Sequence, residues 1–344
     1  MRVIHVLSTD RFSGAENVVC QIINMYKENK DVEMFYCSPD GDIRNAVEQK
    51  AINFIGINKL TFKNLKKVVD EYKPDIIHAH DIRASVLVSL FGKKYKLISH
   101  VHTNSEKTKK LSLKSLLFLK ASAKFSHIYW VSNSSLNEFY FYNNVLKNSS
   151  VLTNVIAIDE IIEKASQEEC DKYDVIFVGR LTDVKDPIRL INVFKMVVEK
   201  RKNAKLAIVG DGDLKDAVKE CIVSNKLEKN VDLLGFQKNP YKFMKNTKLM
   251  LMTSKFEGTP MCALEAMALG LPIISTPTDG LVELIEQDKS GFLSNDDVEL
   301  KDKIVEILSD DKKYLKMSKY AENKSKMVND IKKYKKELDK KYFK

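Results

Sequence analysis

The sequence predicts two doubly wound α/β domains, each built on a parallel sheet that helices cover on both faces. Short apolar runs alternate with helix-length segments, which is typical of parallel strands buried on both sides. This pattern occurs twice, with a break near residues 159–172, where the chain is charged and lacks a strand. The length of 344 residues fits two domains. We therefore expect domains over residues 1–160 and 172–310, followed by a Lys-rich helical segment over 311–344.

The apolar runs give the expected strands in chain order. In the first domain they are Val3–Leu7, Met34–Cys37, Asp75–His78, Leu97–Val101 and Ile128–Val131. In the second domain they are Asp174–Val178, Lys205–Val209, Val231–Leu234, Leu249–Met252 and Pro272–Ser275. Ligands of such sheets bind at the carboxyl ends of the strands, so the residues just after each run are the candidates for function.

Composition and charge narrow the class of protein. Apolar residues make up 44% and charged residues 30%, which excludes a disordered chain. The net charge is +10, but residues 312–344 hold thirteen Lys against four acidic residues, and residues 106–124 hold six Lys against one. The rest of the chain is therefore net acidic. A nucleic-acid groove would spread its positive charge, so we expect no nucleic-acid partner, and an anionic surface or solubility explains the two basic segments.

Cysteine usage and hydropathy predict a cytoplasmic protein. The five cysteines are scattered without a Cys-x-x-Cys pair, which excludes a zinc ribbon and favours a reducing compartment. The first residues become polar too soon for a signal peptide. No apolar run approaches the ~18 residues that span a bilayer.

A glycine follows the first expected strand. Gly14 would let the backbone approach a ligand, and a helix that starts near Asn17 would offer free N–H groups. An ordinary strand-to-helix turn explains the same residues. The loop lacks the Gly-x-Gly-x-x-Gly pattern of dinucleotide-binding domains, and the chain has no Walker lysine motif, which disfavours an NTPase.

Two cations follow the first expected strand of the second domain. Arg180 stands at the strand end and Lys185 five residues later, before a helix that we expect to start near Pro187. Arginine offers a planar fork and lysine a point charge, so the pair suits a diphosphate. Surface ion pairs with Asp183 or Asp186 are the alternative.

Residues 256–272 carry the most informative pattern. We expect a helix that is capped by Thr259 and has Pro260 as its first residue. The N–H groups of the next three residues would then be unpaired at the positive end of the helix dipole, where an anion binds.

Two carboxylates flank the start of this helix. Glu265 lies more than one turn inside it among apolar residues, where a carboxylate is costly unless paired. Ribose hydroxyls would satisfy it, and an ordinary salt bridge is the alternative. Glu257 lies in the preceding loop. If the eight residues from Glu257 to Glu265 are helical, the two carboxylates lie about 12 Å apart. This distance fits two ends of one elongated ligand better than the closer carboxylate pair of a glycoside hydrolase.

Two expected strands end in His-x-His pairs. Strand alternation places His100 and His102 on one face, and His78 and His80 close a neighbouring strand, where they could meet an acceptor. For each histidine a structural role is the alternative. Pairs on two separate strand ends have no standard ligand spacing, so we expect no metal.

Together these motifs resemble the retaining glycosyltransferases of family four, which have the GT-B fold. The resemblance covers nearly the whole chain and rests on Glu257-x7-Glu265 with Gly258 and Pro260 between, Gly179-Arg180-Leu181 followed by Lys185, and Gly210-Asp-Gly212. It implies two facing Rossmann-like domains with an interdomain cleft. It also implies a nucleotide-sugar donor on the second domain, an acceptor on the first, and C-terminal helices that pack back on the first domain.

By position, the resemblance also implies a role for each residue. Arg180 and Lys185 would hold the diphosphate, and Glu265 the ribose hydroxyls. Glu257 would contact hydroxyls of the transferred sugar, and His102, the last histidine of its strand, would orient the sugar beside the reacting carbon, with His100 as second choice. The remaining donor contacts would come from the backbone of Thr259, Pro260, Met261 and Cys262, and Gly14 stands where the family often has a second glycine.

We therefore predict a retaining, metal-independent hexosyltransferase that uses no cofactor. It would move a hexose or N-acetylhexosamine from a UDP-sugar to a glycan or lipid-linked acceptor in cell-surface polysaccharide synthesis, such as capsule formation. The basic helix within residues 106–124 would either lie on the anionic inner face of the membrane or be an ordinary solvated helix. A nucleotide-sugar epimerase of the same fold and a non-catalytic basic binding module are the alternatives.

Overall fold

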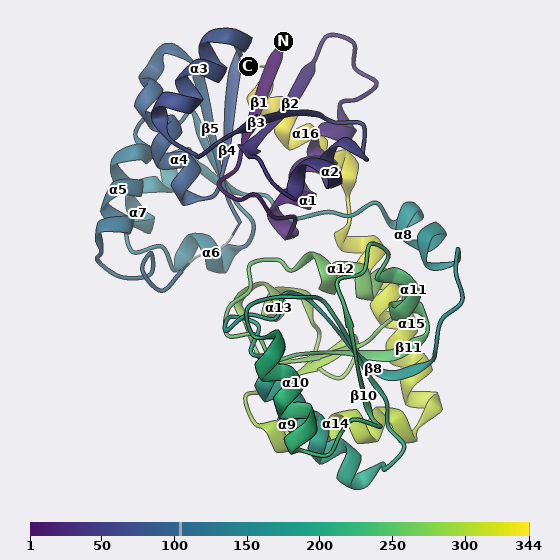
Figure 1. Cartoon of the computed structure of the whole chain (residues 1–344). Helices are drawn as coiled ribbons and strands as arrows, with labels where there is room; N and C mark the ends of the chain where they lie inside the picture. Colours follow the sequence, from purple (N-terminus) through teal and green to yellow (C-terminus); the bar gives the residue numbers. More distant parts are fainter. Residues whose placement is uncertain (103–104, 344) are drawn as a thin grey trace. The chain divides into compact units, whose positions relative to one another are not determined.

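The computed structural model describes residues 1–102 and 105–343 and divides the chain into two compact units (Figure 1). Unit 1 comprises Met1–Asn154 together with Ile331–Lys344, and unit 2 comprises Val155–Asp330. Each unit contains one parallel sheet flanked by helices. The prediction of two parallel α/β domains is therefore confirmed.

Unit 1 is built on a seven-stranded sheet with the order β3-β2-β1-β4-β5-β6-β7. Its strands are β1 (Arg2–Val6), β2 (Glu33–Pro39), β3 (Asn53–Ile57), β4 (Ile76–His80), β5 (Lys96–Val101), β6 (His127–Trp130) and β7 (Ser149–Val151). Its helices are α1 (Gly14–Met25), α2 (Ile43–Glu48), α3 (Phe62–Tyr72), α4 (Ile82–Val88), α5 (Leu113–Ser122), α6 (Asn133–Asn137), α7 (Tyr142–Val145) and α16 (Ile331–Tyr342), with 3₁₀ turns at Ser89–Lys94 and Leu146–Asn148.

The two faces of this sheet differ in chemistry. One face packs an apolar core against α3, α4 and α5, with residues such as Ile77, Phe118 and Trp130 at 0% exposure. The other face carries histidines and tyrosines, and α16 lies against it through Tyr334, Leu338 and further contacts (Figure 1). The polar face is where the unit's unusual side chains gather.

Unit 2 is built on a six-stranded sheet with the order β10-β9-β8-β11-β12-β13. Its strands are β8 (Tyr173–Val178), β9 (Leu206–Val209), β10 (Val231–Gly235), β11 (Thr247–Met252), β12 (Ile273–Ser275) and β13 (Gly291–Leu293). Its helices are α8 (Ile158–Ala165), α9 (Pro187–Lys200), α10 (Lys215–Ser224), α11 (Tyr241–Lys245), α12 (Met261–Ala268), α13 (Asp279–Leu284), α14 (Asp297–Ser309) and α15 (Asp311–Val328). None of the helices in the described part of the chain is long and apolar enough to span a bilayer.

Three strands of the structure, β3, β7 and β13, were not predicted from the sequence. Strands β7 and β13 have only three residues each, and β3 contains Gly56 and has a half-exposed pattern. All three lie at sheet edges, where short strands with a solvated side lack the continuous apolar runs of central strands.

The division between the units differs from the expected boundaries. Helix α8 belongs to unit 2, so the first unit ends before residue 160. Helix α15, which we expected on the first domain, also belongs to unit 2, because Met317 and Ala321 are buried there against α12 and α14. Only α16 of the Lys-rich segment is part of unit 1.

Candidate functional site

The ends of strands β8 and β9 are locked together by glycine contacts. A Cβ on Gly210 would lie 1.8 Å from the carbonyl oxygen of Gly179, and one on Gly212 would lie 2.4 Å from that of Leu181. The Leu181 N–H donates to the Asp211 carbonyl oxygen over 2.9 Å. This close approach fixes the backbone on both sides of Arg180, and it explains why glycines stand at both positions.

Gly210→Ala should therefore destabilise unit 2 by about 3 kcal/mol or more, because the backbone must part and φ is +146°. Thermal unfolding measures the loss. Gly235→Ala is the matched control, since Gly235 also has a positive φ (+65°) but open space around it, and it should cost only about 1 kcal/mol. Equal losses in the two variants would contradict the steric explanation.

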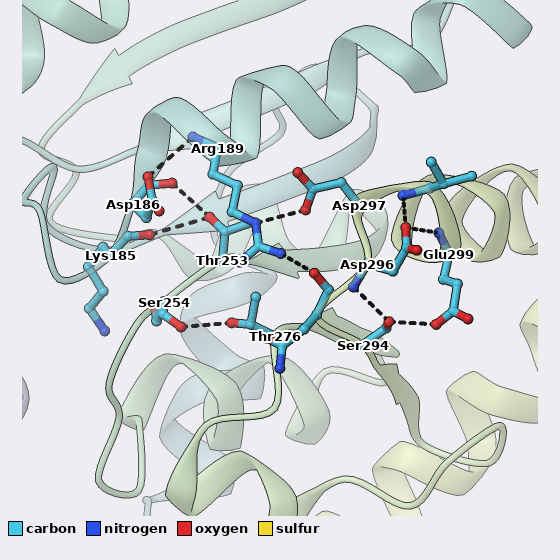
Figure 2. A network of polar contacts seen from close by, with 12 residues as sticks. Lys185, Asp186, Arg189, Thr253, Ser254, Thr276, Ser294, Asp296, Asp297 and Glu299 are labelled. Carbon is cyan, nitrogen blue, oxygen red and sulfur yellow. Dashed lines mark hydrogen bonds and ion pairs between the residues drawn. The ribbon is translucent and has the colours of Figure 1, made fainter.

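A polar network holds the loop after β8 against the end of β11 (Figure 2). The Thr253 hydroxyl donates to the carbonyl oxygens of Asp186 and Lys185, over 2.8 and 3.4 Å. Asp186 caps α9 by accepting from the Arg189 N–H over 3.3 Å. The ammonium of Lys185 points away from this network (Figure 2), so the loop is fixed while the cation stays available for other contacts.

Lys185 is paired with one of the predicted site carboxylates. Its Nζ lies 2.5 Å from Oε1 of Glu257, and the Ser254 hydroxyl donates to the same oxygen over 2.6 Å. The alternative of ion pairs with neighbouring aspartates does not hold for Lys185, because Asp186 caps α9 and Asp183 binds Lys255. Residues 72 positions apart therefore meet at the carboxyl ends of β8 and β11.

The surrounding charges define one electrostatic cluster within unit 2. Lys185 interacts with Arg180, Glu257 and Cys262, and the Cys262 thiol also interacts with Glu265. The structure thus brings together five of the predicted site residues. Arg180 is exposed and has no ion pair among the described residues.

Ionisation follows from burial and from these neighbours. Burial by itself lowers the pKa of Lys185, but the charge and hydrogen bond of Glu257 outweigh it, so that the pKa lies above its usual value. Burial raises the pKa of the Cys262 thiol to about 12 despite the nearby lysine. At neutral pH the cluster therefore contains a charged lysine and a protonated, unreactive thiol.

The start of α12 differs from the prediction. Pro260 is the N-cap, with ψ at 123°, so Thr259 lies one residue too early to cap and Pro260 is not the first helical residue. The Ala263 N–H already donates to the Pro260 carbonyl oxygen over 3.1 Å. Within the described residues, this leaves the N–H groups of Met261 and Cys262 at the positive end of the helix.

Glu265 is buried inside α12, at 7% exposure, and accepts a hydrogen bond from the Tyr241 hydroxyl over 3.1 Å. Burial and this carboxylate raise the pKa of the tyrosine above its usual value. The loop before α12 is also supported by α13, because a Cβ on Gly280 would lie 1.4 Å from the carbonyl oxygen of Gly258. Sequence reasoning missed both Tyr241 and Gly280.

In unit 1, the first loop contains its own polar contact. Gly14 opens α1 behind the N-cap Ser13, three residues earlier than expected. The Ser13 hydroxyl hydrogen-bonds to Glu16, which is buried at 3% exposure in the first turn of α1. A carboxylate therefore occupies the helix start that the sequence suggested for an anion.

The histidines at the carboxyl ends of β4 and β5 lie on one face, as strand alternation predicts. His100 and His102 stack with ring centroids 4.3 Å apart, and His78 and His80 with centroids 4.2 Å apart. The expectation that His78 and His80 meet an acceptor is wrong, because both are at 0% exposure, and His78 contacts the Tyr342 hydroxyl of α16. His102, at 8%, is the most exposed member of this group.

Burial keeps every histidine of the chain neutral. All six lie in unit 1. Burial lowers the pKa to about 3 for His5 and His102, to about 4 for His127, and well below the usual value for the other three. The pKa in the unfolded chain is near 6.5, so below that pH only the unfolded state binds these protons, and stability is lost as the pH falls from about 6.5 towards 3.

Unit 1 should therefore unfold at about pH 5. Each histidine costs about 1.4 kcal/mol per pH unit below 6.5, against a total stability of about 5–15 kcal/mol. Unit 2 contains no histidine and should keep its structure at this pH. The fluorescence of Trp130, the single tryptophan, reports unit 1, and far-UV circular dichroism reports both units. A native Trp130 signal down to pH 4 would contradict this expectation.

Two family models match consecutive parts of the chain. The model described as Glycosyltransferase Family 4 matches residues 12–159, and the model described as Glycosyl transferases group 1 matches residues 158–324. Together they cover residues 12–324 without a gap.

Curated proteins give the same assignment. An uncharacterised glycosyltransferase of Methanocaldococcus jannaschii is 36% identical over 244 residues, covering 64% of this chain and 59% of that protein. The N-acetylgalactosamine-N,N'-diacetylbacillosaminyl-diphospho-undecaprenol 4-alpha-N-acetylgalactosaminyltransferase of Campylobacter jejuni is 33% identical over 156 residues, covering 44% of this chain and 42% of that protein. The matches thus span less than two thirds of either relative's length.

Solved structures share the fold over nearly the whole chain. HepE of Anabaena, in complex with UDP and glucose, aligns with a TM-score of 0.85 at 21% identity, covering 99% of this chain and 98% of that one. TarM of Staphylococcus aureus aligns with a TM-score of 0.78 at 13% identity, covering 99% of both chains. With these matches, two parallel α/β units and the clustered motif residues, the chain belongs to the group 1 glycosyltransferases of family four, with the GT-B fold.

Proposed function

We propose that this glycosyltransferase is a retaining, metal-independent enzyme that uses no cofactor and transfers a hexose or N-acetylhexosamine from a UDP-sugar. The acceptor is a glycan or a lipid-linked saccharide of cell-surface polysaccharide synthesis. Support comes from the names of similar proteins, which include an N-acetylgalactosaminyltransferase with a diphospho-undecaprenol in its name and a poly(ribitol-phosphate) alpha-N-acetylglucosaminyltransferase. HepE, which shares the fold, was solved with UDP-glucose.

The observation that carries the proposal is the cluster of Arg180, Lys185 and Glu257 in unit 2. Breaking the bond between sugar and phosphate leaves negative charge on the departing diphosphate. Fixed cations and helix N–H groups stabilise such a charge because they need no reorganisation during the reaction. Arg180 and Lys185 supply the cations, and the start of α12 at Met261 and Cys262 supplies the N–H groups.

The remaining roles follow the same chemistry. Glu265 accepts hydrogen bonds from the ribose hydroxyls, and Glu257 contacts hydroxyls of the transferred sugar. The backbone from Thr259 to Cys262 contacts sugar and phosphate, and Gly14 allows the first loop to approach the substrate. His102 orients the reacting sugar beside the anomeric carbon.

Thermal unfolding with a panel of nucleotide sugars tests donor binding. A ligand at 100 times its Kd stabilises the protein by about 2.7 kcal/mol. We expect UDP-sugars to raise Tm, and nucleotide sugars with other bases to raise it less. No shift with any nucleotide sugar would overturn the proposal. With the best donor, isomerised donor or free sugar without acceptor would instead indicate an epimerase, and NMR of the anomeric linkage in the product tests retention.

We also propose that α5 and the preceding segment dock on the anionic inner face of the membrane, where a lipid-linked acceptor lies. Four leucines, Leu111, Leu113, Leu116 and Leu117, are 43–74% exposed. The lysines Lys107, Lys110, Lys114 and Lys120 of the same segment are exposed beside them. Exposed apolar side chains flanked by lysines match a membrane with anionic headgroups.

Co-sedimentation with vesicles tests this surface. We expect binding to phosphatidylglycerol vesicles that weakens with salt, and little binding to phosphatidylcholine alone. The double variant Leu113→Ser and Leu117→Ser should lose it. Leu315→Ser is the matched control, because Leu315 is 63% exposed in α15 of unit 2. Absent binding, or equal binding to both vesicle types, would refute the membrane surface.

A further inference from the structure

Three imidazoles of unit 1 form a hydrogen-bonded chain that leads to His102. Nδ1 of His5 lies 2.9 Å from Nε2 of His80, and Nδ1 of His80 lies 3.0 Å from Nε2 of His102. The three residues come from β1, the end of β4 and the position after β5, which are neighbouring strands. His80 therefore has both ring nitrogens in contact with another imidazole.

Stacking fixes the planes of these rings. His78 covers His80 with an interplanar angle of 30°, and His100 covers His102 with an angle of 23°. His78 is itself held by the Tyr342 hydroxyl of α16, 2.7 Å from its Nδ1. The rings are thus held both along the strands and across them.

The chain couples the positions of three protons. Each neutral imidazole carries one N–H and one bare nitrogen. If the proton of His102 is on Nδ1, its Nε2 accepts from His80 Nδ1–H, and Nε2 of His80 accepts from His5 Nδ1–H. If the proton of His102 is on Nε2, both hydrogen bonds reverse. Lowered pKa values from burial keep all three rings neutral, as either arrangement requires.

The two outermost nitrogens of the three hydrogen-bonded imidazoles distinguish between these arrangements. Nε2 of His5 and Nδ1 of His102 are buried and have no hydrogen-bond partner among the described residues. An unpaired buried N–H is rarer in proteins than an unsatisfied acceptor. His5 is at 0% exposure, whereas His102 lies at 8% just beyond a strand end, where ligands of such sheets bind. The bare nitrogen therefore belongs at His5 and the N–H at His102.

We propose that His80, with His5 behind it, is a positioning residue that holds His102 as the tautomer with its proton on Nδ1, ready to donate a hydrogen bond to a substrate oxygen. This inference rests on the proposed role of His102 in transfer. It adds the direction of the hydrogen bond and the residues that impose it.

A metal site is the competing explanation of the same rings. Two groups, His5–His78–His80 and His80–His100–His102, bring ligand nitrogens within 4.8 Å of one another. The hydrogen-bonded chain is favoured because both nitrogens of His80 already face other imidazoles, and because the paired rings stack face to face instead of converging.

Nitrogen NMR of protein labelled with ¹⁵N-histidine tests the tautomer without substrate. We expect His102 to show a protonated Nδ1 and a bare Nε2 in the wild type. His80→Asn should keep this spectrum, because the asparagine amide replaces Nδ1 of His80, whereas His80→Gln should give a mixture of tautomers. A protonated Nε2 on His102 in the wild type, or zinc bound in stoichiometric amount to the purified protein, would overturn the proposal.

Kinetics of the same variants test whether the tautomer matters for transfer. His80→Gln, whose amide replaces Nε2, should lower kcat about tenfold with little change in KM, as loss of a partner that orients a functional histidine does. His80→Asn should recover most of this loss. His127→Gln is the control, because His127 is not part of the hydrogen-bonded row of imidazoles and its ring contacts Ser150 over 2.7 Å. Equal kcat in His80→Asn and His80→Gln would overturn the positioning role.

The two readouts separate this inference from the proposed function. Full transfer by His102→Ala would refute the role of His102 itself and, with it, the functional meaning of the chain. The tautomer spectrum is recorded without sugar donor or acceptor substrate. A spectrum that differs from the prediction would therefore refute only the hydrogen-bonded arrangement of the three imidazoles.

Discussion

Lys185→Ala is expected to reduce transfer by about 10³-fold while unit 2 stays folded. Removal of one group that stabilises developing negative charge typically costs about 10²–10³ in rate. Here a second effect adds to it, because Glu257 loses its partner at 2.5 Å and its charge then repels the diphosphate. Steady-state kinetics with a UDP-sugar measure the loss, and thermal unfolding verifies the fold.

Lys255→Ala is the matched control for this variant. Lys255 lies on the neighbouring loop and binds Asp183, whose side chain is 83% exposed. Its removal changes the net charge by the same amount, yet transfer should remain within about twofold of the wild type, because exposed ion pairs contribute little. Full activity of Lys185→Ala would remove the lysine from the site.

Glu257→Gln is expected to separate nucleotide binding from transfer. In the free protein, Glu257 neutralises Lys185, so the amide should free the lysine for the diphosphate of UDP. We expect the Kd for UDP to stay equal or fall by up to about tenfold, which corresponds to about 1.4 kcal/mol. Transfer should nevertheless fall by about 10²–10³, because the contact with the sugar hydroxyls weakens. Calorimetric titration with UDP and transfer kinetics measure the two effects.

Asp183→Asn controls for the loss of negative charge. Asp183 lies on the β8–α9 loop, but its carboxylate binds Lys255 and not Lys185. This variant should leave both the UDP affinity and the rate nearly unchanged. Weaker UDP binding by Glu257→Gln would mean that the carboxylate supports the diphosphate site instead of competing for its lysine.

The site in unit 2 could be predicted largely from strand ends. Arg180, Lys185 and Glu257 follow central strands whose apolar runs are long, and parallel strands deliver their carboxyl ends to one edge. The ion pair between Lys185 and Glu257 could not be predicted, because it depends on the conformations of two loops whose residues are 72 positions apart in the sequence. Tyr241 was missed for the same reason, since nothing in α11 signals that its hydroxyl reaches Glu265.

Other features of the two units could not be predicted because they depend on local backbone geometry and on the register between strands. Thr259 precedes a proline, and the sequence does not reveal that Pro260 keeps the extended ψ that ends the loop. Alternation placed His100 beside His102 correctly. The chain through His80 and His5, however, requires the register of three neighbouring strands, in which His5 lies opposite His78 and His80 opposite His100. Register between strands distant in sequence depends on packing.

A crystal structure of the protein with an intact UDP-sugar would show where the donor binds. We predict diphosphate oxygens within hydrogen-bonding distance of Arg180 and Lys185, with the ribose hydroxyls at Glu265. A nucleotide bound elsewhere on the chain, with the ion pair of Lys185 and Glu257 undisturbed, would contradict it.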